Sequence, residues 1–193
     1  SLASIYTRLG RISEALEEAR KAVARDRQNV GARILLGNLY TSLNKKNEAK
    51  KEYLRAIQID PQAEHAYLSL GGLLADEGNT DGAKETLQDL LKINPNSVLG
   101  LYSLGKLHAL SQDYDGAEKY FKMALKRAPV FDKAMSSLGG VYEIKGKLQE
   151  ALELYNKMLE LNPLNKVIKE RIGRIYMRQD DLGKALEQFT GLS

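Results

Sequence analysis

Apolar residues recur along the chain at spacings of three and four, in short runs separated by polar turns. One run carries Leu101, Leu104 and His108, and the next carries Ala117 and Phe121. Residues at these spacings lie on one face of a helix. The turns between runs contain Gly, Asn and Ser, as in Gly78-Asn79-Thr80, Ser111-Gln112-Asp113 and Lys145-Gly146-Lys147. The pattern therefore predicts an all-α chain built from pairs of helices.

The helix pairs repeat with a fixed period of 34 residues. The prolines follow this period at Pro61, Pro95, Pro129 and Pro163. Glycines follow it at Gly37, Gly71, Gly105, Gly139 and Gly173, and alanines at Ala15, Ala49, Ala83, Ala117, Ala151 and Ala185. Proline cannot continue a helix and disfavours helical geometry in the preceding residue, so we expect each proline to separate one helix pair from the next.

A further column, four residues after each alanine, is mostly aromatic: Ala19, Tyr53, Leu87, Phe121, Tyr155 and Phe189. Glycine in a helix interior costs about 1 kcal/mol relative to alanine, so a packing gain must compensate for the five glycines. We expect each glycine to face the alanine of the second helix at close approach, with the aromatic ring filling the space beside them. Stacked repeats then share one continuous core.

The order Leu-Gly, Tyr, Ala, aromatic, Ala and Pro is met most fully by Leu36-Gly37, Tyr40, Ala49, Tyr53, Ala56 and Pro61, and it resembles the tetratricopeptide repeat family. The resemblance covers essentially the whole chain. It divides the chain into six repeats: 1–29, 30–63, 64–97, 98–131, 132–165 and 166–193, with the first and last truncated. It implies a single domain over 1–193, an all-α, right-handed superhelical α-solenoid of antiparallel helix pairs.

Composition limits the function classes. The chain has 193 residues, 43% hydrophobic and 28% charged, which is enough apolar surface for a folded core. A net charge of +4 is too small to indicate a nucleic-acid partner. Because cysteine is absent, disulfides, thiolate metal sites and cysteine nucleophiles are excluded. No apolar run approaches the ~20 residues of a membrane span.

The start of the chain lacks the charged and then apolar pattern of a signal peptide. It also lacks an initiating methionine and begins inside a repeat, which favours a segment excised from a longer chain. A cytoplasmic location is favoured, and a periplasmic or membrane-tethered one stays open if a signal or anchor lies upstream.

Candidate chemistry is sparse. Residues 100–107 nearly match a phosphate-binding loop, but Leu107 stands where Ser or Thr must reach magnesium, and the segment lies in a predicted helix. His108 takes the tyrosine position of sister repeats and is expected to pack as a ring with one polar tip, while His65 is expected on the surface. We predict no catalytic, cofactor or metal site and no enzymatic activity.

The resemblance implies that the first helices of the repeats line a concave groove that receives a peptide. The expected groove residues are Leu35, Asn38, Leu68, Ser69, Leu99, Tyr102, Lys106, Lys133, Ser137, Arg171, Arg174 and Arg178. In the predicted helix 166–178, the three arginines recur along one face, typical either of a carboxylate-binding stripe or of a solvated surface. The partner is thus expected to be a protein or peptide, with an acidic segment if the stripe binds it.

The sequence favours a protein-interaction scaffold or adaptor that binds a peptide in its concave groove. Two alternatives stay open. The chain can be the regulatory or substrate-recruiting arm of a larger enzyme, or it can self-assemble through exposed solenoid ends.

Overall fold

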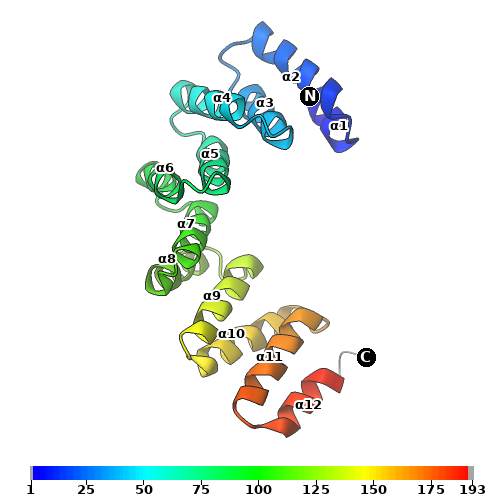
Figure 1. Ribbon diagram of the computed structural model, residues 1–193, viewed down its shortest axis with the longest axis vertical. Helices are drawn as coiled ribbons and strands as arrows, with labels where there is room; N and C mark the ends of the chain where they lie inside the picture. Colours follow the sequence, from blue (N-terminus) through cyan, green and yellow to red (C-terminus); the bar gives the residue numbers. More distant parts are fainter. Residues whose placement is uncertain (1, 191–193) are drawn as a thin grey trace. The chain divides into compact units, whose positions relative to one another are not determined.

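The computed structural model describes residues 2–190, which form twelve α-helices and no strand (Figure 1). The helices are α1 (Leu2–Arg8), α2 (Ile12–Arg25), α3 (Val30–Ser42), α4 (Lys46–Ile59), α5 (Glu64–Asp76), α6 (Thr80–Ile93), α7 (Val98–Leu110), α8 (Tyr114–Arg127), α9 (Asp132–Ile144), α10 (Leu148–Leu161), α11 (Lys166–Arg178) and α12 (Leu182–Thr190). The predicted all-α class is confirmed.

Each of the six predicted repeats contains one pair of helices, an odd-numbered first helix and an even-numbered second helix. By its internal contacts the chain divides into two compact units, 1–103 and 104–193, with the boundary inside α7. In the first unit each helix from α1 to α6 packs on the next, and α3 also contacts α5. In the second unit the same succession runs from α8 to α12. The organisation as one array over 1–193 stays a prediction.

The turn inside each repeat has the same backbone geometry. One residue per turn has a positive φ, between 56° and 78°, and these residues are 34 apart: Gly10, Asn44, Gly78, Gln112, Gly146 and Asp180. A left-handed residue after a helix ends it by redirecting the chain. The side chains of Asn79 and Asp113 then cap α6 and α8 by accepting from the N–H of Gly82 and Gly116. The turns predicted at 78–80, 111–113 and 145–147 are confirmed.

The prolines lie in the turns between repeats. The residue before Pro61, Asp60, is extended (φ −130°, ψ 99°), and its N–H still donates to the carbonyl of Ala56. An extended residue is what a following proline favours, and α4 ends at Ile59.

The repeat glycines are required by close packing between the two helices of a repeat. A methyl group on Gly37 would lie 2.5 Å from Cε1 of Tyr53, and one on Gly105 would lie 2.6 Å from a carbon of the Phe121 ring. The predicted close approach is confirmed, but the residue that faces the glycine is the aromatic one. The alanine column is also buried, with Ala117 fully so.

Residues 100–107 lie inside α7, so the near match to a phosphate-binding loop is helical. Its backbone N–H groups point along the helix and cannot surround a phosphate. None of the helices described within 2–190 combines the length and the hydrophobicity that a transmembrane span requires.

Candidate functional site

All twelve predicted groove residues lie on first helices, and none is fully buried. Six are exposed: Asn38, Leu99, Lys106, Lys133, Arg174 and Arg178. The other six are half-buried: Leu35, Leu68, Ser69, Tyr102, Ser137 and Arg171. Every one therefore keeps some surface that a ligand can contact.

In the first unit, the structure brings Asn38 of α3 and Ser69 of α5 together. The Ser69 hydroxyl donates to Oδ1 of Asn38 over 3.3 Å, and the Tyr53 hydroxyl donates to the same atom over 2.7 Å. Tyr53 belongs to the aromatic column of α4 and also contacts the hydroxyl of Thr41 at 3.1 Å. The cluster is uncharged and joins the second and third repeats.

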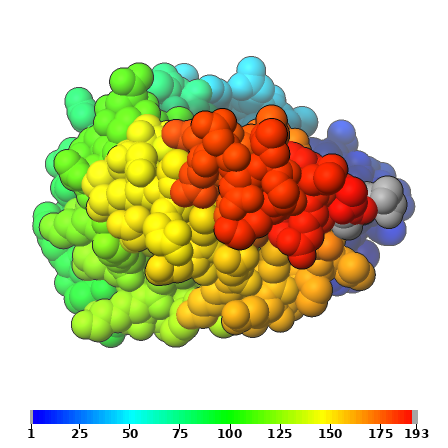
Figure 2. All heavy atoms as spheres, turned by 90° about the horizontal axis from the view of Figure 1, so that it is seen from below, coloured from blue at the N-terminus to red at the C-terminus, as the bar shows by residue number. Residues whose placement is uncertain are grey.

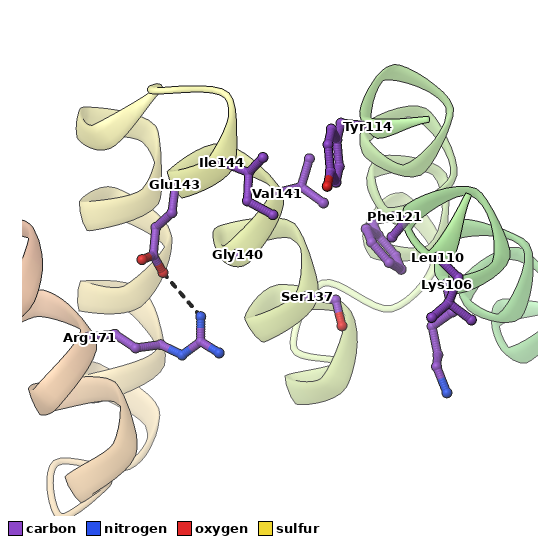
Figure 3. A pocket seen from close by; sticks show the side chains of 11 residues that line it. Lys106, Leu110, Tyr114, Phe121, Ser137, Gly140, Val141, Glu143, Ile144 and Arg171 are labelled. Atoms are coloured by element: carbon purple, nitrogen blue, oxygen red, sulfur yellow. Dashed lines mark hydrogen bonds and ion pairs between the residues drawn. The ribbon is translucent and has the colours of Figure 1, made fainter. Parts of the chain in front are cut away.

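In the second unit, an open hollow of about 510 Å³ lies over α9 (Figure 3). It brings together three of the predicted groove residues, Lys106, Ser137 and Arg171. Helices α7, α8, α9 and α11 supply its walls.

Much of the lining is apolar, with Leu110, Tyr114, Phe121, Val141 and Ile144 gathered between α9 and the α7–α8 pair (Figure 3). Leu110 and Ile144 are 72% and 61% exposed, and both line this hollow. Both are the last residues of their helices and hold equivalent positions in adjacent repeats. Apolar surface of this kind is available to a ligand rather than used by the core.

A glycine keeps the hollow open. A methyl group on Gly140 would meet only Nη1 of Arg171, at 3.5 Å, whereas one on the adjacent Gly139 would collide with the ring of Tyr155. Gly139 is thus required by the core, and Gly140 leaves free space in the hollow.

A charged network closes one side of the hollow. The Tyr155 hydroxyl donates to Oε1 of Glu143 over 2.5 Å, and Nη1 of Arg171 donates to that oxygen over 3.1 Å and to the Tyr155 hydroxyl over 2.9 Å. The Arg171 guanidinium also lies 5.7 Å from the centre of the Tyr155 ring. Burial, and then the hydrogen bond to Glu143, raise the pKa of the Tyr155 hydroxyl well above its usual range. It stays a neutral donor at any physiological pH.

Lys106 lies across the hollow from this network, on α7 (Figure 3). Within residues 2–190, no hydrogen bond or ion pair is formed by the Lys106 ammonium or by the Ser137 hydroxyl. The hollow therefore offers one free cation and one free hydroxyl beside its apolar lining.

The three arginines of α11 are not equivalent. Arg171 is held by Glu143 and Tyr155, and Arg174 forms an ion pair with Glu170 of its own helix. Arg178 lies with Arg174 and Met177 at a separate shallow hollow. Whether the stripe binds a carboxylate stays a prediction.

Tyr155 is a site residue that the repeat pattern predicts only as a core residue. The sequence does contain a feature that indicates a polar role for this tyrosine. Tyr53 and Tyr155 occur in two of the three repeats that have a polar residue at the matching first-helix position, Thr41 and Glu143. The first repeat is the exception, since it has Thr7 with Ala19. Where that position is apolar, the column has no hydroxyl, as in the pairs Ala75 with Leu87, Ala109 with Phe121, and Met177 with Phe189.

The histidines take the predicted environments. His65 is exposed. His108 packs its ring 5.0 Å from that of Tyr120, and its Nδ1 lies 2.7 Å from Oδ2 of Asp113. Its Nε2 is buried and has no hydrogen-bond partner among the described residues. No cluster of His, Asp and Glu suited to a metal ion occurs within 2–190.

Two family models described as tetratricopeptide repeat match the chain. One matches residues 6–73, and the other matches 68–130 and 102–166. A comparison with curated proteins found no sequence match.

Solved structures with the same fold include MamA, at 23% identity and a TM-score of 0.73, with 81% of this chain and 92% of MamA covered. YrrB, described as a tetratricopeptide protein with an unusual peptide-binding site, has 22% identity and a TM-score of 0.71, with 92% of this chain and 91% of YrrB covered. A thermophilic tetratricopeptide protein of Thermus thermophilus has 24% identity and a TM-score of 0.70, covering 91% of this chain and 96% of its own. At these identities the likeness establishes the fold alone.

Proposed function

The chain belongs to the tetratricopeptide repeat family, a family of protein-interaction modules, and from that premise we propose that it is a scaffold or adaptor that binds a segment of a partner protein. In this proposal it acts by binding and not as an enzyme. The partner segment contacts the first helices, whose candidate residues all keep accessible surface.

The observation that carries the proposal is the hollow over α9. It combines exposed apolar side chains, a bare helix surface at Gly140 and polar groups at its edge. Concave apolar surface with a few polar groups is the usual form of a binding site, and a buried apolar anchor supplies most of the affinity of a peptide complex. A peptide-binding neighbour of the same fold, YrrB, supports the same class of ligand.

Each compact unit has candidate binding residues of its own. The first unit contributes Leu35, Asn38, Leu68, Ser69, Leu99 and Tyr102, and the second contributes Lys106, Lys133, Ser137, Arg171, Arg174 and Arg178. The first set is uncharged, whereas the second contains five cations. An acidic segment of the partner would therefore bind the second unit.

The test is selection from a random peptide library displayed on phage, with the wild-type chain as bait. Gly140→Leu directs a side chain toward the hollow, since a Cβ at Gly140 would meet only Nη1 of Arg171, at 3.5 Å. We expect selected peptides to lose at least about tenfold in affinity for this variant, because their anchor has no space. Gly72→Leu is the matched control at the equivalent position of α5, where a Cβ would meet nothing within 4 Å.

Melting curves first establish that both variants remain folded. If the wild-type chain enriches no peptide, or if Gly140→Leu binds the selected peptides as well as Gly72→Leu does, the hollow is not the binding site.

Self-assembly is a second candidate, favoured by the outer surface of α12. Leu182 and Leu186 are 68% and 64% exposed. Leu152, the residue of α10 equivalent to Leu186, is buried, and α10 packs on α11 of the next repeat. Helix α12, coloured red, lies on the near side in Figure 2. Light scattering over a concentration series tests this: we expect Leu186→Glu to abolish any concentration-dependent increase in mass, and a wild-type chain that is monomeric throughout would rule it out.

A further inference from the structure

We propose that the second compact unit binds the surface of a membrane that contains anionic lipids. The contact is made by the turn edge, which consists of the turns 128–131 and 162–165 between repeats. Val130 and Leu164 of these turns insert among the lipid headgroups, and the basic residues around them contact the headgroup charges. The inference goes beyond the proposed peptide binding, because neither turn lines the hollow over α9.

The turn that carries Leu164 is built in the same way as three other turns between repeats. In each of the four, the side chain of an Asp or Asn accepts a hydrogen bond from the backbone N–H two residues later. The residues that donate this N–H, at the tips of the turns, are Gln28, Gln62, Asn96 and Leu164. Because the same turn forms with a polar residue at its tip, its geometry does not require the leucine.

The core does not require this leucine either. Leu164 is 82% exposed, and Val130, the equivalent residue of the preceding repeat, is 61% exposed. Two more exposed apolar side chains are close to Leu164 in sequence, Leu161 at the end of α10 and Val167 in the first turn of α11. Exposed apolar side chains gathered in one place indicate an interaction surface.

The two turns lie at the same end of the second unit. Helix α9 begins directly after the turn 128–131, and α10 ends directly before the turn 162–165. Helices α9 and α10 pack on each other and are joined by the short turn 145–147, so they run antiparallel. The start of α9 and the end of α10 are therefore at one end of the pair, which places Val130 and Leu164 along one edge.

Basic residues outnumber acidic ones around both tips. Residues 126–135 include three basic and one acidic side chain, and residues 160–169 include two basic and one acidic. The equivalent segment around Gln62, residues 58–67, has two acidic side chains and no Lys or Arg. The segment around Gln28 is also basic, but its tip is polar. Among the five turns between repeats, the two of the turn edge alone combine an apolar tip with an excess of basic residues.

A lipid surface fits these protruding tips better than a folded protein or a nucleic acid does. A protein would need a cavity for each tip, whereas a fluid lipid layer adapts to them. A nucleic acid would bind the cations and leave the apolar side chains without a partner. Apolar side chains next to Lys and Arg are the combination that binds the interface of anionic membranes.

The backbone of the Leu164 turn suits such an insertion. The Leu164 N–H donates to Oδ1 of Asn162 over 3.3 Å, so this group keeps a hydrogen bond when the tip leaves water. Pro163 precedes the tip and restricts the backbone there. Little conformational freedom is therefore lost on binding.

The experiment is sedimentation of the full chain with vesicles of phosphatidylcholine alone and of an equal mixture of phosphatidylcholine and phosphatidylglycerol. We expect binding to the mixed vesicles only, and weaker binding as salt is added. Leu164→Gln should weaken binding at least about tenfold, because it removes the apolar side chain that the membrane buries. Lys126→Gln combined with Lys166→Gln should also weaken it at least about tenfold, since each basic residue near an anionic surface contributes about fivefold.

Two matched variants change exposed residues away from the turn edge. Leu54→Gln replaces a leucine of α4, and Lys119→Gln replaces a lysine in the first half of α8. Both should stay within about twofold of the wild type. Melting curves first establish that every variant remains folded, which is expected because all the substituted side chains are exposed.

A wild-type chain that binds neither kind of vesicle at low salt would overturn the inference, and so would a loss for Leu164→Gln no larger than that for Leu54→Gln. A chain that binds a single-stranded oligonucleotide but not the mixed vesicles would assign the basic residues to nucleic acid and overturn it as well. The proposed peptide binding does not depend on any of these results.

Discussion

Adjacent repeats are joined by different chemistry in the two compact units. In the first unit, Ser97 and Asn94 donate to the two carboxylate oxygens of Glu64 over 2.7 and 2.8 Å, and Ser69 donates to Asn38. In the second, Lys145 lies 2.6 Å and Lys147 3.1 Å from the carboxylate of Glu118, and Arg171 pairs with Glu143. These links have neutral donors in the first unit and are ion pairs in the second. Charged donors also join repeats in the first unit, where Lys46 donates to the carbonyl of Asp76, but there the acceptor is neutral.

The repeat determines where the tyrosine hydroxyl lies, and the neighbouring side chains determine which partners it has. Tyr53 and Tyr155 hold equivalent positions, and both aim the hydroxyl at the first helix of their own repeat. The residue found there decides the result: Thr41 and Asn38 make a neutral cluster, whereas Glu143 draws in Arg171 from the next repeat. The repeat fixes the geometry, and single side chains fix the charge of the surface.

The largest effect should come from Glu118→Gln. Burial alone would favour the neutral acid, but hydrogen bonds from Lys122, Lys145 and Lys147 outweigh it and hold the pKa of Glu118 at about 2. Because this pKa is lowered from 4.5, the carboxylate stabilises the fold above pH 4.5, and the contribution falls as the pH drops toward 2. We expect Glu118→Gln to reduce the free energy of unfolding by about 3 kcal/mol at pH 7. Urea denaturation at pH 7, 5 and 3 measures the difference, which should shrink at pH 3.

The matched change in the first unit is Glu64→Gln. Ser97 and Asn94 donate to different oxygens of Glu64, and the amide keeps only one of these acceptors. One neutral hydrogen bond is therefore lost, and we expect a loss of about 1 kcal/mol and little response to added salt. Equal losses for the two variants, with the same salt response, would show that the two units do not differ in the way described above.

The second prediction concerns the tyrosine hydroxyls. Tyr155→Phe removes a hydrogen bond to a carboxylate and leaves Glu143 and Arg171 with one partner fewer, so it should reduce the unfolding free energy by about 2 kcal/mol. Tyr53→Phe removes a bond between neutral groups and should reduce it by about 1 kcal/mol. Urea denaturation of both variants checks the order, and a larger loss for Tyr53→Phe would contradict it.

The sequence predicts most of this fold because the residues that recur every 34 positions are the ones that form the turns and the close contacts between helices. Proline, glycine and alanine columns mark the turns and the tight contacts, and helices begin at residues 30, 64, 98, 132 and 166, the first residues of the predicted repeats. The prediction erred in one contact, since the glycines face the aromatic column directly. Distances between helices depend on how the rings stack, which residue order does not specify.

The candidate site is only partly predictable. Lys106, Ser137 and Arg171 are expected from their position on first helices, and the structure gathers them at one hollow. Arg171 looks like a free cation in sequence because its partner, Glu143, lies 28 residues earlier in another repeat. The hollow itself depends on Gly140. The sequence shows only a second glycine beside the repeat glycine, and it does not show that the space next to Gly140 is open.

The smallest effects should come from alanine at the two glycine pairs, Gly71-Gly72 and Gly139-Gly140. A methyl group on Gly139 would collide with the Tyr155 ring, which Glu143 and Arg171 hold in place, while one on Gly71 would lie 3.0 Å from Cγ of Leu87. Overpacking costs roughly 1–3 kcal/mol, and alanine returns about 1 kcal/mol of helix propensity. We therefore expect Gly139→Ala to lose about 1 kcal/mol and Gly71→Ala to be nearly neutral.

Gly140→Ala provides the internal contrast, because its methyl group enters the hollow and meets only Arg171 at ordinary contact distance. It should raise the unfolding free energy by about 0.5–1 kcal/mol, since helix propensity improves and no core contact is disturbed. Urea denaturation of the four single variants at both glycine pairs measures all of these effects. Stabilisation by Gly140→Ala together with weaker peptide binding would show that this glycine is kept for the ligand. If Gly140→Ala loses as much stability as Gly139→Ala, then Gly140 is packed against neighbouring residues and does not leave open space in the hollow.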